Sequence, residues 1–132
     1  MRKLITAGLT AKIILVILAL LLVFHVLVLC GVVPAGMIWG GQLDDDAPNI
    51  VAMELVALLV TLLFMGVVAA KLYYRRPGIL RTSISIAVWL MFVYFVLNTA
   101  GNILSPGAFE NYVFAPLTIL LSLLLLRLGL EK

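Results

Sequence analysis

The sequence predicts an all-α protein, a four-helix transmembrane bundle with both its N- and C-termini in the cytoplasm. One observation is a set of four apolar runs, near residues 13–33, 50–70, 83–104 and 108–128, each close to the roughly 20 residues that cross a bilayer as a helix. Another is that 65% of the 132 residues are hydrophobic and only 11% are charged, unlike a soluble domain. The runs fill most of the chain and predict a single membrane domain over residues 1–132.

The basic residues set the predicted orientation. All nine lie before the first run, between the second and third runs, or at the end of the fourth. The gap between the first two runs instead carries Asp44, Asp45 and Asp46, and the gap between the last two has no Lys or Arg. By the positive-inside rule, both termini and the middle loop are cytoplasmic. The net charge of +3 therefore predicts contact with the head groups of a lipid bilayer and not with a nucleic acid.

The first run, residues 13–33, is expected to be a retained helix. Its apolar stretch is longer than the roughly 7–15 residues of a signal-peptide core. The loop that follows is rich in Gly yet contains Met37, Ile38 and Trp39. A fully solvated linker has no need of such side chains, so we expect this loop to fold back onto the outer mouth of the bundle, with Trp39 in a lid.

Short connections predict that the other helices are antiparallel neighbours. Pro77 and Gly78 form a strong turn signal between the second and third runs. Before the fourth run, Ser105 is the expected N-cap and Pro106 the expected first helical residue. Pro116 interrupts this run and removes a backbone donor, so a kink is expected there.

Polar side chains within the runs are candidates for function because they are costly in lipid. They gather toward the extracytoplasmic third, whereas the cytoplasmic half is almost entirely Leu, Val, Ile and Ala. Three of them share one face of the third helix at i, i+4 and i+8, and an inward-pointing face would bring them to His25 and Glu54. The result would be a polar pocket that opens to the outside. The candidate ligand-binding residues are Glu54, His25, Asn98, Asn102, Trp39, Tyr94, Glu110 and Asn111.

Several candidates also have a structural interpretation. Asn98 and Asn102 can hold helices together through interhelical hydrogen bonds. Glu110 can complement the positive end of the last helix. His25 can satisfy a neighbouring carbonyl, or it can exchange a proton with Glu54, because imidazole titrates near neutral pH. Glu54 has the strongest functional indication, since a carboxylate a full turn inside the membrane needs a partner, a proton or water.

Other kinds of site are poorly supported. One His and one Cys do not provide the usual nitrogen and sulfur ligands of a metal, so neither a metal nor another cofactor is expected. Cys30, as the single cysteine, forms no disulfide within the chain. No Ser or Cys has an evident base beside it, and there is no phosphate-binding Gly loop with a Lys. An enzyme is therefore the least favoured class.

Three segments resemble a group of small bacterial four-helix integral membrane proteins. They are the Trp-Gly-Gly within residues 38–43, the acidic Glu54, and the Asn-Thr-x-Gly-Asn at residues 98–102. The resemblance implies a multi-pass protein of the bacterial inner membrane and a set of positions, but no activity. In size and number of spans the chain is also similar to small multidrug-resistance transporters, yet it has only His25 where these carry an essential acidic residue in the first helix.

The sequence thus predicts a protein that binds or translocates a small polar or cationic solute through an outward-facing pocket. Glu54 would supply charge, His25 would couple binding to protons, and the asparagines would orient the solute. Translocation needs a route through the apolar cytoplasmic half, which a homodimer could supply. The alternative is a non-catalytic accessory subunit of a larger membrane complex. A solvent-connected cavity at Glu54 would favour the first function, and a closed, fully paired network would favour the second.

Overall fold

The computed structural model describes residues 5–34 and 49–132, and these residues form a bundle of helices without a strand. The helices are α1 (Ala7–Leu29), α2 (Ile50–Tyr73), α3 (Ile79–Leu104) and α4 (Ala115–Gly129), and the π-helical turn η3 (Glu110–Phe114) leads directly into α4. Within these described ranges, four helices are long and apolar enough to cross a membrane when η3 and α4 are taken as one. The predicted all-α, four-helix fold class is confirmed.

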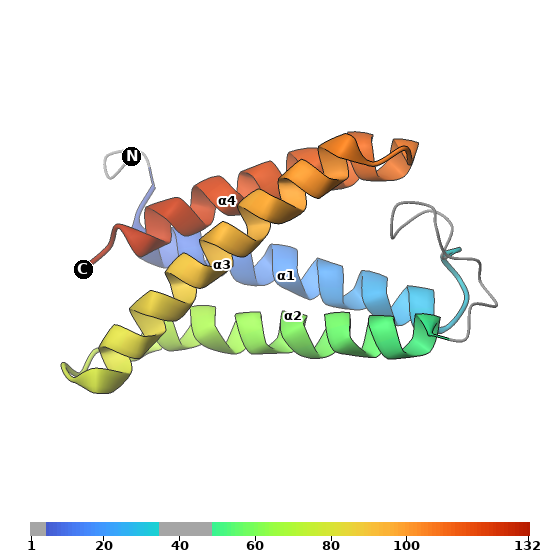
Figure 1. The fold of residues 1–132 in the computed structure, drawn as a ribbon. Coiled ribbons are helices and arrows are strands. Elements are labelled where there is room, and N and C mark those ends of the chain that lie inside the picture. Colours follow the sequence, from blue (N-terminus) through green and yellow to red (C-terminus); the bar gives the residue numbers. More distant parts are fainter. Residues whose placement is uncertain (1–4, 35–48) are drawn as a thin grey trace.

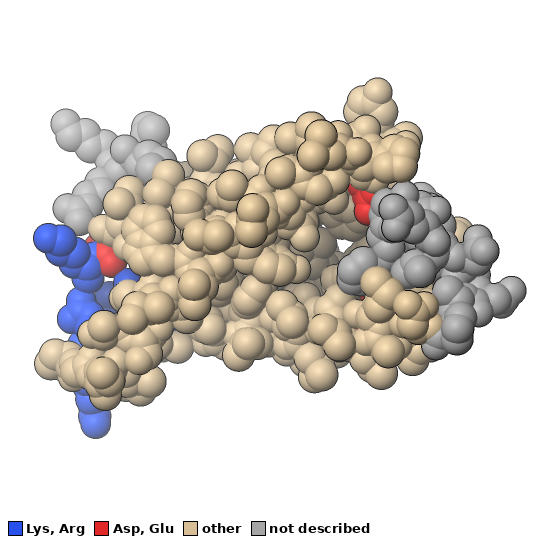
Figure 2. Space-filling view, in the orientation of Figure 1, with Lys and Arg blue, Asp and Glu red and all other residues tan. Residues whose placement is uncertain are grey.

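Consecutive helices form two hairpins, α1 with α2 and α3 with α4 (Figure 1). α1 and α4 join the hairpins, whereas α2 and α3 diverge from their short turn (Figure 1). The start of α1, the α2–α3 turn and the end of α4 lie together at one end of the bundle. We call this the basic end because Lys and Arg side chains gather there (Figure 2). The opposite end, where α1 ends and η3 begins, is the loop end.

An N-cap residue and a glycine after the last turn set the ends of α1. These ends differ from those of the predicted span, residues 13–33. The Thr6 hydroxyl accepts a hydrogen bond from the backbone amide of Leu9 (3.2 Å), so the helix starts before the apolar run does. At the other end, Gly31 has a φ of +77° and closes the helix with the backbone hydrogen bonds of a Schellman motif. The apolar run continues past this glycine, but the helix does not.

The other helices also extend beyond the predicted spans. α2 continues to Tyr73, and α3 begins at Ile79. The predicted bounds followed the edges of the apolar runs. A helix can continue past such an edge because a long cationic side chain such as the exposed Arg81 can place its charge in water, and the ammonium group of Lys71 is hydrogen-bonded to Ser85 and to the carbonyl of Glu131.

Gly78 enables the turn between α2 and α3. Its φ of +134° and ψ of −173° lie in a region that is essentially restricted to glycine. We expect Gly78→Ala to lower the free energy of unfolding by about 1–3 kcal/mol, measured by reversible unfolding in mixed detergent micelles. Gly66→Ala is the matched control, because a Cβ added at Gly66 meets nothing within 4 Å and the helical backbone favours Ala. A similar loss in both variants would contradict the role of the Gly78 backbone.

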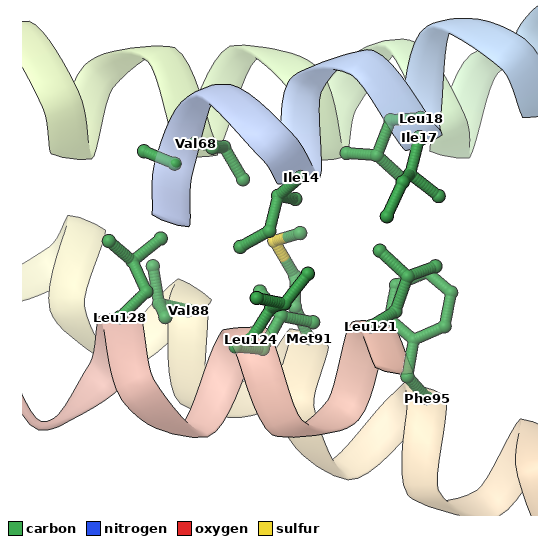
Figure 3. Close-up of a cluster of buried hydrophobic side chains, with 12 residues drawn as sticks. Ile14, Ile17, Leu18, Val68, Val88, Met91, Phe95, Leu121, Leu124 and Leu128 are labelled. Atoms are coloured by element: carbon green, nitrogen blue, oxygen red, sulfur yellow. The ribbon is translucent and has the colours of Figure 1, made fainter. Parts of the chain in front are cut away.

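The apolar core lies in the half of the bundle nearer the basic end, and Figure 3 shows how its side chains meet. α1, α3 and α4 contribute to it at helical spacing, as Val88, Met91 and Phe95 do in α3, and α2 contributes Val68. Side chains from both hairpins therefore interdigitate there and close the middle of the bundle. The buried cluster comprises Ala11, Ile14, Ile17, Leu18, Val68, Val88, Met91, Phe95, Leu121, Leu124, Leu125 and Leu128.

The start of the fourth helix differs from the prediction. The expected N-cap role of Ser105 is wrong, because helical backbone begins only at residue 108 and Ser105 is instead the C-cap of α3. Pro116 is preceded by the π-helical turn η3, in which the amide of Ala115 donates to the carbonyl of Glu110. A wider turn accommodates the missing proline donor, so the helix is irregular directly before Pro116, where a kink was expected.

Large apolar side chains cover the outside of the bundle. Leu20 in α1, Leu63 in α2 and Leu97 in α3 are each about two-thirds exposed, at 66%, 64% and 67%. Exposure of this much apolar surface to water would be costly, whereas lipid chains cover it at no such cost. The surface is therefore that of a helical bundle suited to a membrane.

Candidate functional site

A cavity of about 170 Å³ lies between the two hairpins, toward the loop end. Residues of all four helical segments line it, so its shape depends on how the hairpins pack. In Figure 2 the face between α2 and α3 is hollowed on the side nearer the loop end. We call this the polar cavity. Its polar lining comprises His25, Glu54, Thr61, Tyr94, Asn98, Asn102, Glu110 and Thr118.

An imidazole and a carboxylate meet in the wall of this cavity. Nδ1 of His25 on α1 lies 2.7 Å from Oε2 of Glu54 on α2, which is hydrogen-bond distance. The Glu54 side chain is completely buried, at 0% exposure, and that of His25 is 20% exposed. An ionised Glu54 accepts from Nδ1–H, and the imidazole is the partner that a solute can reach. The two helices thus present a buried carboxyl group behind an accessible ring.

Hydrogen bonds between α3 and α4 form the opposite wall. Nδ2 of Asn102 donates to Oδ1 of Asn98 one turn earlier (3.0 Å) and lies 3.5 Å from the hydroxyl oxygen of Thr118 on α4. The Thr99 hydroxyl lies 2.9 Å from the same Thr118 oxygen. Both asparagines also line the polar cavity. The Asn102 carboxamide is therefore placed both to join α3 to α4 and to contact a solute, whereas that of Asn98 bonds within α3.

Glu110 adds a second carboxylate to the cavity lining. It is buried, at 7% exposure, although it lies only a short way into the helical segment that begins at residue 108. The Ser105 hydroxyl donates to Oε2 of Glu110 and accepts from the backbone amide of Gly107 (3.1 Å). Oε2 is also close to Gly107, where an added Cβ would lie 3.3 Å from it. The turn after α3 therefore holds this carboxylate in place.

Two aromatic clusters flank the polar cavity, and of their members sequence reasoning had named only Tyr94. Phe24 of α1 contacts Phe114 with the ring centroids 5.1 Å apart. Phe64 of α2 contacts Tyr94 and Phe95 of α3, at 5.1 and 5.8 Å. All five rings line the cavity. Phenylalanine occurs at any position of an apolar run. The sequence therefore does not distinguish a Phe that lines a cavity from a Phe that faces lipid.

Two predicted site residues are not placed in the polar cavity. The carboxamide of Asn111 donates to the carbonyls of Asn102 and Ser105, at 2.8 Å for the latter, and so caps the end of α3. Asn111 is not among the residues that line the cavity. Trp39, together with the loop that we expected to cover the pocket, lies outside the described residues. A ligand-binding role for Trp39 stays a prediction.

The capping contact of Asn111 can be tested separately from ligand binding. We expect Asn111→Leu to lower the free energy of unfolding by about 1–2 kcal/mol, because carbonyls at the end of α3 lose a donor. Asn49→Leu is the matched control, since Asn49 is exposed and its side chain makes no capping hydrogen bond. Unfolding in mixed micelles measures both variants. An unchanged stability of Asn111→Leu would show that the cap is dispensable.

The lining of the polar cavity suits ionic and hydrogen-bonding contacts better than metal coordination. Within the described parts of the chain, no group of three or more His, Cys, Asp or Glu side chains could hold a metal ion. The lining offers carboxylates, carboxamides, one imidazole and aromatic faces.

Fold and site together define the class: a helical multi-pass bundle with a polar cavity between its hairpins. Comparison of the chain with models of protein families, with curated proteins and with solved structures finds no match. The function is therefore inferred from the geometry of the cavity.

Proposed function

We propose that this chain is a multi-pass protein of the bacterial inner membrane that binds a small organic cation in the polar cavity. The observation that carries the proposal is the presence of two buried carboxylates, Glu54 and Glu110, in one aromatic-walled cavity between helices. The resemblance to small bacterial four-helix proteins supports the choice of membrane. The positive-inside rule favours a cytoplasmic basic end, which makes the cavity outward-facing.

The charge of the lining favours a cation. Two carboxylates and one imidazole line the polar cavity, and no Lys or Arg is among the described residues that do so. With both carboxyl groups ionised, the lining has a net negative charge even when His25 is protonated. Charge–charge interactions are stronger inside a bundle of low dielectric constant than in water, so this imbalance attracts a cation.

The rings and the volume narrow the class of cation. Aromatic faces such as those of Phe24, Phe64 and Tyr94 bind methylated ammonium groups through cation–π contacts. The volume of about 170 Å³ is close to the roughly 150 Å³ of an engineered cavity that admits benzene. A small alkylammonium group therefore fits, whereas a drug-sized ligand needs about 300 Å³ or more.

The packed core favours binding over transport by a single copy. In the described residues, the buried apolar cluster around Ile14, Met91 and Leu125 lies between the polar cavity and the basic end. A solute would have to separate the two hairpins to pass. Translocation would accordingly need a route formed with a second copy of the chain, and the cavity would then be the outward-facing half of that route.

One observation favours the accessory-subunit alternative. Every buried side-chain nitrogen and oxygen in the described part of the chain has a hydrogen-bond partner. Such a network can serve to hold helices in register without any solute. The two functions differ in the expected effect of Glu54→Gln, which should abolish cation binding under the first and dissociate a membrane complex under the second.

Ligand stabilisation of the purified protein tests the proposal. Thermal unfolding is measured in mild detergent with tetramethylammonium chloride and, separately, with neopentyl alcohol as an uncharged molecule of similar size. Cation binding at about 100 times Kd should stabilise the fold by about 2.7 kcal/mol, and the alcohol should have little effect. Sodium chloride at equal ionic strength controls for screening. Equal stabilisation by the alcohol, or none by the cation, would contradict the proposal.

A further inference from the structure

A narrow cleft lies at the basic end, where the ends of all four helices meet. Its volume is about 40 Å³, compared with the roughly 10–15 Å³ that one water needs, so it accommodates a group of only a few heavy atoms. We call it the basic cleft. Among the described residues, the cationic side chains that line it are Lys71, Arg75, Arg81 and Lys132.

Hydrogen bonds hold Lys71 in the basic cleft. Its ammonium group donates to the hydroxyl of Ser85 (3.1 Å) and to the backbone carbonyl of Glu131 (3.0 Å). Within the described residues these contacts engage two of its three donors, which leaves one for a ligand. The Glu131 carboxylate also lines the cleft, and its Oε2 lies 3.0 Å from Nη1 of Arg127. Four cations against one carboxylate make the cleft a site for an anion.

An apolar groove adjoins the basic cleft and shares Ile84 with it. The groove lies between α2 and α3, where these helices diverge from their turn, and it has a volume of about 610 Å³ (Figure 1). Small side chains leave room in it, including Gly66 and Ala70 on α2 and Ala87 on α3. The rest of its lining is almost entirely aliphatic, so its natural occupant is a hydrocarbon chain.

We propose that the basic cleft and the adjoining groove bind one anionic phospholipid. Its phosphate lies among Lys71, Arg75 and Arg81, and one acyl chain lies in the groove between α2 and α3. Arginine guanidinium groups suit phosphate because they donate two parallel hydrogen bonds. Basic pockets between membrane helices are suited to anionic lipid head groups. The site shares no lining residue with the polar cavity, so it does not depend on the cation proposal.

Native mass spectrometry of the purified chain with phosphatidylglycerol measures this binding. Arg81→Gln should weaken phosphatidylglycerol binding about fivefold, and so should Arg75→Gln. Arg76→Gln is the matched control, because it removes the same charge from the same turn but Arg76 does not line the cleft. It should change binding less than twofold. An equal loss for Arg76→Gln would show diffuse attraction and overturn the site.

A second pair of variants tests the acyl chain without changing charge. Gly66→Leu fills the groove at a position where an added Cβ meets nothing within 4 Å, and it should weaken phosphatidylglycerol binding severalfold. Ala100→Leu, at an exposed α3 position outside the groove, should not. Inorganic phosphate is titrated in parallel and should bind far more weakly than the lipid. Unchanged lipid binding by Gly66→Leu, or equal binding of inorganic phosphate, would reduce the site to an anion site and overturn the lipid assignment.

Discussion

Replacement of Glu54 by Gln should weaken the binding of tetramethylammonium at least about 30-fold and leave the bundle folded. The carboxylate is fully buried, so its charge acts on the cavity with little screening by water. Glutamine keeps the shape and can still accept a hydrogen bond from Nδ1 of His25. The change thus removes the charge while retaining the contact, and the dissociation constant measured by thermal shift or calorimetry reports the effect.

Glu131→Gln is the matched control for this prediction. It makes the same chemical change at the opposite end of the bundle, where Glu131 pairs with Arg127. Cation binding should stay within about twofold of that of the unaltered chain, because the distance and the intervening core separate it from the polar cavity. Similar binding by both variants would show that Glu54 contributes no charge to the site. Dissociation of a membrane complex by Glu54→Gln, without any loss of solute response, would favour the accessory subunit.

His25→Ala should lower the free energy of unfolding by about 3 kcal/mol. The substitution removes the imidazole that lies 2.7 Å from the buried Glu54 carboxylate and leaves that charge in a wall with fewer compensating contacts. Part of the loss comes from the smaller side chain, because the cavity becomes larger. Reversible unfolding in mixed micelles measures the change.

A double-mutant cycle separates the contact between His25 and Glu54 from the loss of volume. The variant with both His25→Ala and Glu54→Gln should recover at least about 1 kcal/mol relative to the sum of the single changes, since no buried carboxylate then remains to be compensated. Two groups in direct contact couple in this way, whereas independent groups add within about 0.5 kcal/mol. Additive effects would show that the contact contributes nothing to stability.

The fold could be predicted because it depends on the length of the apolar runs and on the positions of the charges, which are visible in the sequence. Four apolar runs of spanning length leave no alternative to a helical bundle, and alternating charge gives its expected orientation. The helix ends were harder to predict, because they depend on caps such as Thr6 and on the backbone conformation of Gly31, and not on the lipid boundary. The π-bulge before Pro116 depends on the packing of a whole segment, which no local pattern encodes.

Part of the candidate site could be predicted from the depth of each polar residue in the membrane and from the helix face on which it lies. His25 and Glu54 lie at similar depths in neighbouring helices, and the structure brings them into contact. Asn111 was grouped with them on polarity alone, and its place at the end of α3 follows from the turn geometry. The basic residues were expected to set the orientation and to contact lipid head groups, but the sequence did not indicate that Lys71, Arg75 and Arg81 line one cleft.

The resonances of the single histidine test the central claim most directly. The chain contains one His, so in an untagged, nitrogen-15-labelled sample the imidazole signals belong to His25 without further assignment. Addition of tetramethylammonium should shift the His25 ring nitrogens in a saturable manner, and Glu54→Gln should move this response to concentrations at least about 30-fold higher. Ring signals that do not respond to the cation, or that respond equally in Glu54→Gln, would contradict a solute site built on this pair.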